Sequence, residues 1–202
     1  MSQLKEPAIA AIAIVIGVLL GLLLAWSWRW YRSRRARLAL VATITGIGVD
    51  HVRDVIVPDG NGGFHHVDYA LLTPRGILII DVRDVSGNVF GSDQMSHWTV
   101  MDGAQRTTFP NPQPGLYDRI ASVRQFGEQL PVDGRVVFTR RASFPKGLPR
   151  FALGIDALGT EFPPLDRDTA ERAAAAFRGA WDRFKAGVQP SPLVNPKSVV
   201  DN

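Results

Sequence analysis

Residues 65–83 decide the fold; they read His65-His66-Val67-Asp68-Tyr69-Ala70-Leu71-Leu72-Thr73-Pro74-Arg75-Gly76-Ile77-Leu78-Ile79-Ile80-Asp81-Val82-Arg83. Two apolar runs, rich in β-branched and aromatic residues, flank a Thr-Pro-Arg-Gly turn with proline second and glycine fourth. The pattern predicts an antiparallel hairpin in which Thr73 pairs with Gly76. Both faces of its strands are apolar, which is typical of strands buried inside a sheet.

Two carboxylates stand at the open end of this hairpin. Counting outward from the Thr73–Gly76 pair places Asp68 opposite Asp81, on one face and with Cβ atoms about 5 Å apart. The same count places His66 opposite Arg83. Paired carboxylates beside an apolar ribbon favour a divalent-metal site with Asp68 and Asp81 as ligands. The alternative for Asp81, a strand-ending acid that caps nearby backbone N–H groups, stays open.

An uncharged apolar run covers residues 8–26. As a helix it is long enough to cross the ~30 Å hydrocarbon core of a membrane. Aromatic residues follow it at once, as they do at a membrane interface. Because the run ends in tryptophan rather than in a small-residue cleavage site, residues 1–28 are predicted to be a retained single-pass anchor and not a cleaved signal peptide.

A basic cluster at residues 29–37 follows the apolar run. The positive-inside rule places this cluster and the rest of the chain on the cytoplasmic side of the cell inner membrane, with the N-terminus outside. The cluster is expected to contact anionic lipid headgroups. The basic residues concerned are Arg29, Arg32, Arg34, Arg35 and Arg37.

Charge outside this cluster is balanced. The chain carries a net charge of +4, but from Leu38 onward it has 17 Lys and Arg residues against 18 Asp and Glu. Global charge therefore gives no support for nucleic-acid binding. Cysteine is absent, which agrees with a cytoplasmic compartment.

Residues 38–187 are predicted to form one domain, and the Pro- and Ser-rich residues 188–202 a disordered tail. Asp168 is expected to cap the last helix. The mixed order of elements predicts an α/β (α+β) fold with helices over a mixed, largely antiparallel sheet. Besides the hairpin, strands are expected at 52–57, 98–101, 135–139 and 151–155, and helices at 116–130 and 168–185.

Several of these motifs follow the order of one known family. They are Val67-Asp68-Tyr69, the run from Pro74-Arg75-Gly76 to Asp81-Val82-Arg83, then Gly87, Gly91 and Trp98, and Asn111-Pro112 ahead of a helix and the strand Val136-Val137-Phe138. Over residues 38–158 the sequence resembles the nuclease-related domain (NERD) family, which belongs with the PD-(D/E)xK nucleases. The resemblance implies a restriction-endonuclease-like fold and a role in DNA processing.

The resemblance also assigns roles to the residues of the hairpin. Asp68 and Asp81 take the positions that hold Mg²⁺, which prefers hard oxygen ligands and activates a water for hydrolysis. Arg83 takes the position of the family's lysine, but an arginine cannot lose its proton and act as a base. Asp81 stands where glutamate is usual, and the glutamate expected on the first helix has no counterpart. His66 is a candidate base.

Two functions stay open at this point. The sequence favours a membrane-anchored cytoplasmic NERD-like domain with a degenerate nuclease site and a nucleic-acid-related or scaffold role. The alternative is an active Mg²⁺-dependent phosphodiesterase that cleaves DNA. It would use Asp68 and Asp81 as metal ligands and Arg83 as an electrostatic stabiliser.

Overall fold

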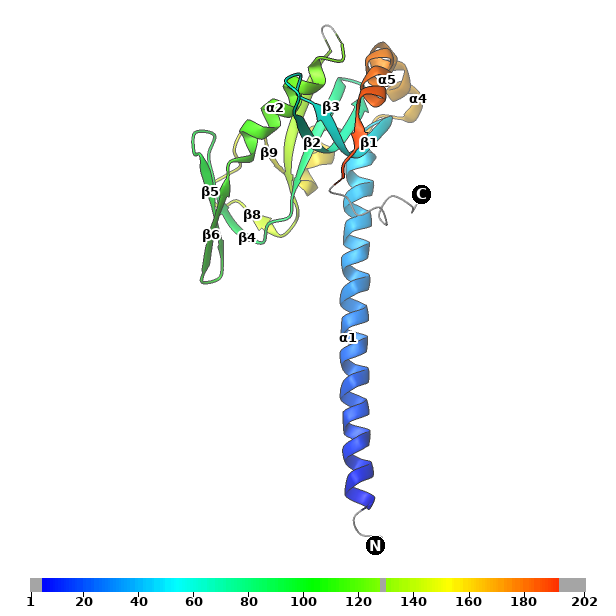
Figure 1. Cartoon of the computed structure of the whole chain (residues 1–202), viewed down its shortest axis with the longest axis vertical. Helices are drawn as coiled ribbons and strands as arrows, with labels where there is room; N and C mark the ends of the chain where they lie inside the picture. Colours follow the sequence, from blue (N-terminus) through cyan, green and yellow to red (C-terminus); the bar gives the residue numbers. More distant parts are fainter. Residues whose placement is uncertain (1–4, 128–129, 193–202) are drawn as a thin grey trace. The chain divides into compact units, whose positions relative to one another are not determined.

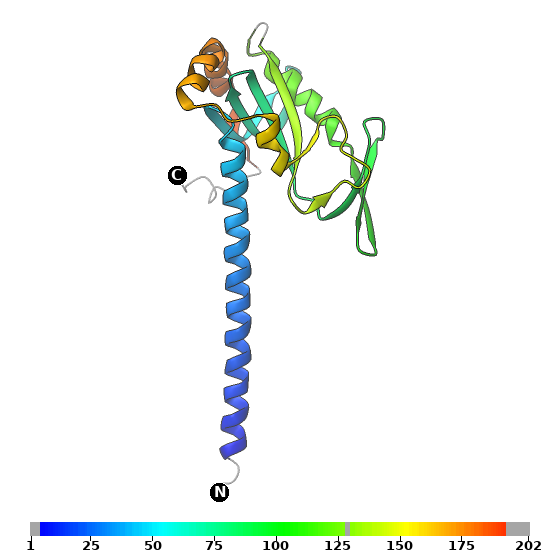
Figure 2. The ribbon, with the colours of Figure 1, turned by 180° about the vertical axis from the view of Figure 1, so that it is seen from behind.

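The computed structural model describes residues 5–127 and 130–192, with side chains from residue 17 onward except residue 18. The chain divides into two compact units, Met1–Ala42 and Thr43–Asn202. Helix α1 (Lys5–Thr45) makes up the described part of the first unit. Its last residues belong to the second unit, where Ile44 is fully buried. Figures 1 and 2 show the elements from opposite sides.

Helix α1 corrects the predicted transmembrane anchor. Among residues 5–127 and 130–192, no helix is both long enough and apolar enough to cross a membrane. Residues 8–16 and 18 of the predicted span lie outside the described side chains. The inner-membrane localisation and the lipid contacts predicted for residues 29–37 depend on this anchor, and the structure does not support them.

The main sheet of the second unit has six strands in the order β10-β1-β2-β3-β7-β9. Strand β3 pairs antiparallel with β2 on one side and parallel with β7 on the other, so the sheet is mixed. The hairpin therefore lies at the centre of this sheet. The strands are β1 (Asp50–Pro58), β2 (Phe64–Thr73), β3 (Gly76–Arg83), β7 (Val132–Phe138), β9 (Ala152–Gly154) and β10 (Gln189–Pro190).

The predicted hairpin register is confirmed. Thr73 pairs with Gly76, and the ladder runs outward to the pair Tyr69–Ile80. The Thr73 hydroxyl donates to the Gly76 carbonyl at 2.8 Å. Gly76 has a φ of +117°, and a Cβ there would lie 2.2 Å from the carbonyl oxygen of Pro131, so only glycine fits. Both faces of the hairpin are buried, as its apolar pattern predicts; the buried residues are Ala70, Leu71, Leu72, Ile77, Leu78, Ile79 and Ile80.

A second sheet corrects the predicted single-sheet fold. It has the order β6-β5-β4-β8 and includes the strand expected at 98–101. Gly87 has a φ of +110° and packs against the backbone of Met101, and a Cβ on Gly91 would lie 2.4 Å from Trp98 Cδ2. The two glycines thus fit around β5 of the second sheet, and Trp98 packs into the same buried core as the hairpin. Its strands are β4 (Gly87–Phe90), β5 (His97–Asp102), β6 (Gln105–Pro110) and β8 (Ala142–Ser143).

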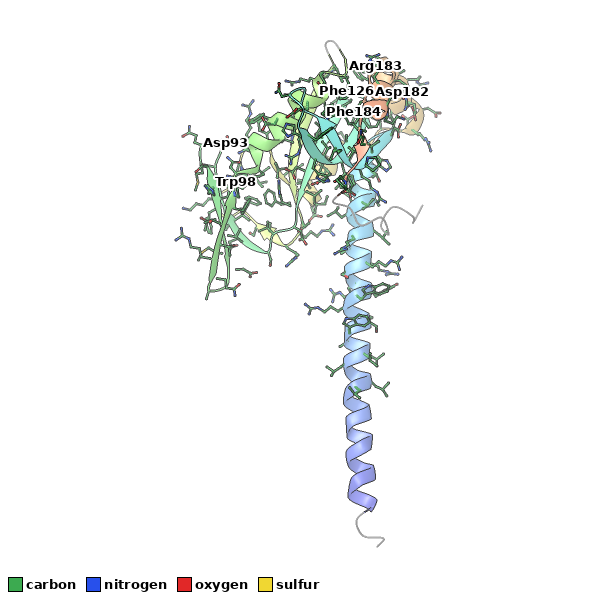
Figure 3. The ribbon with its side chains drawn as sticks, in the orientation of Figure 1. Asp93, Trp98, Phe126, Asp182, Arg183 and Phe184 are labelled. Atoms are coloured by element: carbon green, nitrogen blue, oxygen red, sulfur yellow. The ribbon has the colours of Figure 1, made fainter. Side chains whose placement is uncertain are left out.

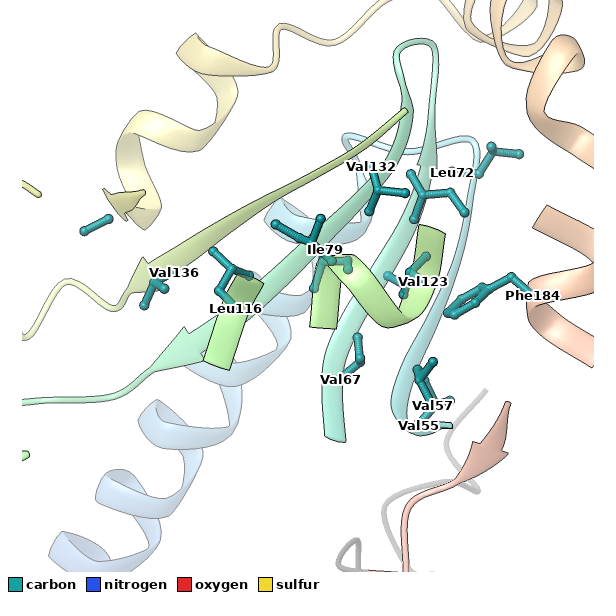
Figure 4. Packing of buried hydrophobic residues seen from close by; sticks show 14 of the residues in the cluster. Val55, Val57, Val67, Leu72, Ile79, Leu116, Val123, Val132, Val136 and Phe184 are labelled. Carbon is teal, nitrogen blue, oxygen red and sulfur yellow. The ribbon is translucent and has the colours of Figure 1, made fainter. Parts of the chain in front are cut away.

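Helix α2 (Pro112–Arg124) begins and ends earlier than the predicted helix at 116–130. The Asn111 side chain caps it by accepting from the Gln113 N–H at 3.0 Å. Figure 4 shows Leu116 and Val123 of its buried stripe among the core residues of the main sheet. The stripe consists of Leu116, Ile120 and Val123.

The C-terminal helix predicted at 168–185 is two helices, α4 (Arg167–Ala174) and α5 (Arg178–Gly187), separated by the 3₁₀ turn η2 (Ala175–Phe177). Asp166, rather than Asp168, caps α4 by accepting from the Thr169 N–H at 3.0 Å. The short η1 (Ile155–Ala157) and α3 (Leu158–Glu161) precede them.

Helix α5 is anchored at both ends of its buried stripe. The Trp181 indole donates to the Asp50 carboxylate at 2.7 Å, which ties the helix to β1. Phe184 meets the ring of Phe126, and Arg183 donates to the Phe126 carbonyl at 2.9 Å (Figure 3). Strand β10 then pairs with β1 where the sequence predicts a disordered tail, whose residues 193–202 lie outside the described part of the chain.

Candidate functional site

The open end of the hairpin carries the two predicted acids. The ladder between β2 and β3 ends at the pair Tyr69–Ile80, and Asp68 and Asp81 are the next residues on each strand. The Asp68 Oδ2 atom accepts a hydrogen bond of 2.7 Å from the Val82 N–H. This bond holds the Asp68 carboxylate beside the backbone that directly follows Asp81, so the structure brings the two acids together as expected.

Asp81 is a buried carboxylate with two guanidinium partners. It is only 4% exposed. Its Oδ2 atom accepts from Arg83 Nη2 at 2.8 Å and lies 3.5 Å from Arg119 Nη1. Burial raises the pKa of Asp81, and the charge of Asp68 adds to this effect, while the two arginines act to lower it; the net pKa is raised. Loss of solvent therefore outweighs the attraction of two cations at this carboxyl.

Asp68 faces a histidine and a third carboxylate. His66 Nδ1 lies 3.2 Å from Asp68 Oδ1, and His66 Nε2 lies 3.9 Å from Asp54 Oδ1. Asp54 stands across from Asp68 on β1, between the pairs Arg53–Tyr69 and Val55–Val67. Its φ of +52° is unusual for a residue other than glycine. Three neighbouring strands therefore supply one acid each to this end of the sheet.

Arg119 reaches the site from helix α2. Its Nε atom donates to the His66 carbonyl at 2.5 Å, and its Nη1 atom lies beside Asp81. Arg119 is not predicted from the sequence because a basic residue within a helix usually faces solvent. The available signal was its spacing: Arg119 follows Leu116 by three positions and precedes Ile120, which places it at the edge of the buried stripe. Asp54 was missed for a similar reason, since it lies in a strand of mixed polarity.

Arg83 occupies the position that the family resemblance gives to a lysine. Its Nη2 atom pairs with Asp81, two residues earlier on the same face of β3. Among the described residues, its Nε atom is buried without a hydrogen-bond partner. Arg83 thus balances the charge of the buried acid, and a guanidinium group cannot act as a base.

The expected Mg²⁺ does not fit these residues as they are arranged. Both oxygens of Asp68 have partners, namely the Val82 N–H and His66, and Asp81 Oδ2 faces two guanidinium groups. In the part of the chain that the structure describes, no group of three or more His, Cys, Asp or Glu side chains is placed to hold a metal ion. Mg²⁺ demands octahedral oxygen ligands, and cations beside the site oppose its entry.

The structure is thus a mixed α/β domain with two sheets, and the central hairpin of its main sheet ends in two acids. The model of the nuclease-related domain (NERD) family matches residues 44–139, and this part of the chain is a nuclease-related domain. The match confirms the predicted family and is consistent with the PD-(D/E)xK nuclease superfamily. It covers Asp54, Asp68, Asp81, Arg83 and Arg119. No curated protein and no solved structure matches the chain.

Proposed function

We propose that this NERD domain has a degenerate nuclease site and serves nucleic-acid processing by binding or scaffolding, without cleaving phosphodiester bonds. The observation that carries the proposal is the pairing of buried Asp81 with both Arg83 and Arg119. The family match supports the nuclease-related role. The arginine pairing supports the loss of hydrolysis.

Metal-assisted hydrolysis needs a cation that activates water and a group that accepts a proton. The two acids that would hold the cation already have protein partners. Arg83, at the position of the lysine, cannot accept a proton. His66, the other candidate base, has both ring nitrogens directed at carboxylates, those of Asp68 and Asp54. Neither requirement is met by the groups at the hairpin end.

A cleavage assay on the full chain tests the proposal. The protein is incubated with single- and double-stranded DNA and with Mg²⁺ or Mn²⁺, beside Asp68→Ala and Asp81→Ala. Asp84→Ala is a matched control, because Asp84 is an acid just past β3 that pairs with Arg141 instead. We expect no metal-dependent cleavage above the level of the two site variants.

The opposite result is equally clear. Cleavage by the unaltered chain that is lost in Asp68→Ala and Asp81→Ala, but kept in Asp84→Ala, would overturn the proposal and establish the alternative, an active Mg²⁺-dependent phosphodiesterase. A DNA-binding titration by fluorescence polarisation completes the experiment. Binding would assign the nucleic-acid role, and its absence would assign the scaffold role.

A further inference from the structure

We propose that Arg119 is the resident cation of the Asp68–Asp81 pair and that it excludes divalent metal ions from this site. The inference rests on the proposed function, since it gives the cause of the degenerate site. It assigns a positioning and charge-balancing role to a residue that lies on helix α2, outside the hairpin motif.

Arg119 is held in place from two sides. Its helix is fixed to the main sheet by the buried side chains of Leu116 and Ile120. Its own guanidinium group donates from Nε to the His66 carbonyl, which leaves Nη1 directed at Asp81 Oδ2, 3.5 Å away. The side chain is 19% exposed. A charge fixed in this way meets little solvent screening, so it acts strongly on its neighbours.

Arg83 alone does not explain the exclusion. A cation two residues after the second acid is part of the arrangement that the family resemblance implies, and there it stands beside a bound metal. Arg119 adds a second positive charge on the same Asp81 oxygen. The difference between a metal-binding pair and this pair is therefore expected to lie in Arg119.

The local charges agree with this assignment. Asp54, Asp68 and Asp81 carry three negative charges, and Arg83 and Arg119 carry two positive charges. His66 lies between Asp54 and Asp68. The cluster is thus balanced to within one charge by the protein alone, and a divalent ion would leave it with an excess of positive charge.

Isothermal titration calorimetry of the full chain with Mn²⁺ tests the inference. The variants are Arg119→Met, the same variant with Asp81→Asn, and Arg124→Met. Arg124 is the matched control, because it lies on the same helix but donates to the Val132 carbonyl rather than to an acid. We expect Arg119→Met to raise Mn²⁺ affinity by at least about tenfold. Adding Asp81→Asn should abolish this gain, and Arg124→Met should show none.

Two results would overturn the inference. One is a folded Arg119→Met protein, by circular dichroism, with the Mn²⁺ affinity of the unaltered chain. The other is an equal gain in Arg124→Met, which would indicate a general effect of net charge. If Arg119→Met does not fold, Arg119→Gln and Arg119→Lys replace it, since glutamine can still donate to the His66 carbonyl. The inference then requires a gain with glutamine and none with lysine.

The two proposals fail separately. Metal-dependent DNA cleavage by the unaltered chain overturns the proposed function. An inactive unaltered chain whose Arg119→Met and Arg119→Gln variants still gain no Mn²⁺ affinity overturns only the role of Arg119.

Discussion

Replacing Asp81 by asparagine separates two opposing energies at the site, the burial of the carboxylate and its attraction to arginine. Burial raises the pKa of Asp81 even beside two guanidinium groups. A carboxyl with a raised pKa in the folded state binds its proton more tightly there than in the unfolded chain. Its ionised form therefore lowers stability as the pH rises above the unfolded pKa. We expect Asp81→Asn to change the free energy of unfolding by less than about 1 kcal/mol at pH 7, or to increase it.

Arg119→Met should behave differently, because it leaves the buried charge with one partner. At 3.5 Å the attraction between Arg119 and Asp81 is at most about 5 kcal/mol for an effective dielectric constant of ~20. Partial exposure and the shared partner Arg83 reduce this value to about 1–2 kcal/mol. The lost hydrogen bond to His66 adds about 1 kcal/mol. With asparagine at position 81 only this last part remains, so the coupling energy of the two sites is expected to be about 1–2 kcal/mol.

The assay is a double-mutant cycle. Urea unfolding of the unaltered chain, the two single variants and the double variant is followed by circular dichroism at pH 7. For a chain of this length, each 1 kcal/mol corresponds to a shift of roughly 2–4 °C in Tm, which gives an independent check. A coupling energy below about 0.5 kcal/mol would show that the two groups do not interact, and the charge argument for this site would then be wrong.

Two further predictions concern the framework of the site. Gly76→Ala should destabilise the fold by about 2–5 kcal/mol, because Gly76 has a positive φ and a Cβ there would clash with Pro131. Gly103→Ala, at a φ of +59° with open space around it, should cost only about 1 kcal/mol. Equal losses of stability for the two variants in thermal denaturation would contradict the clash. Burial acts to raise the pKa of Asp50, but hydrogen bonds from Lys185 and Trp181 lower it below its ordinary value of 3.8. A lowered pKa gives stability that is present above that value and lost as the pH falls through the folded pKa. Asp50→Asn should therefore lower the free energy of unfolding at pH 7, and urea titrations should show the variant and the unaltered chain equally stable below about pH 4. A loss of stability that does not change with pH would argue against the ion pair.

The hairpin was predictable because its information is local. A turn with proline second and glycine fourth fixes the register, and the register places Asp68 and Asp81 at the same end. The structure has this register from Thr73–Gly76 to Tyr69–Ile80. The prediction of a strand buried on both faces does not need an alternation of apolar and polar residues, because the turn residues and the β-branched residues indicate the hairpin.

The second sheet and the helix ends depend on contacts that are distant in sequence. Gly87 and Gly91 belong to the family motif, and the structure shows that they allow the close approach of Met101 and Trp98. The spacing of apolar residues in the sequence does not indicate these contacts. The sequence predicts Asp168 as the cap of the last helix, but the backbone places Asp166 there. The predicted anchor is wrong for another reason: an apolar run followed by aromatic residues favours a membrane span, but among the described residues no helix is both long enough and apolar enough for one.

The occupant of the acidic pair could not be predicted from the hairpin motif, because it is determined by a residue outside that motif. At most positions around a helix a basic side chain is exposed to solvent. Its charge is then solvated, and its attraction to distant acids is weak. Arg119 differs because it lies between the buried positions Leu116 and Ile120. Its guanidinium group contacts the His66 carbonyl on β2 and the Asp81 carboxylate on β3. A basic residue at the edge of the apolar stripe of this helix is therefore the feature to examine in a nuclease-related sequence. Its charge adds to that of the residue two positions after the second acid, and the sum of the two determines whether the pair attracts a metal ion or is already neutralised.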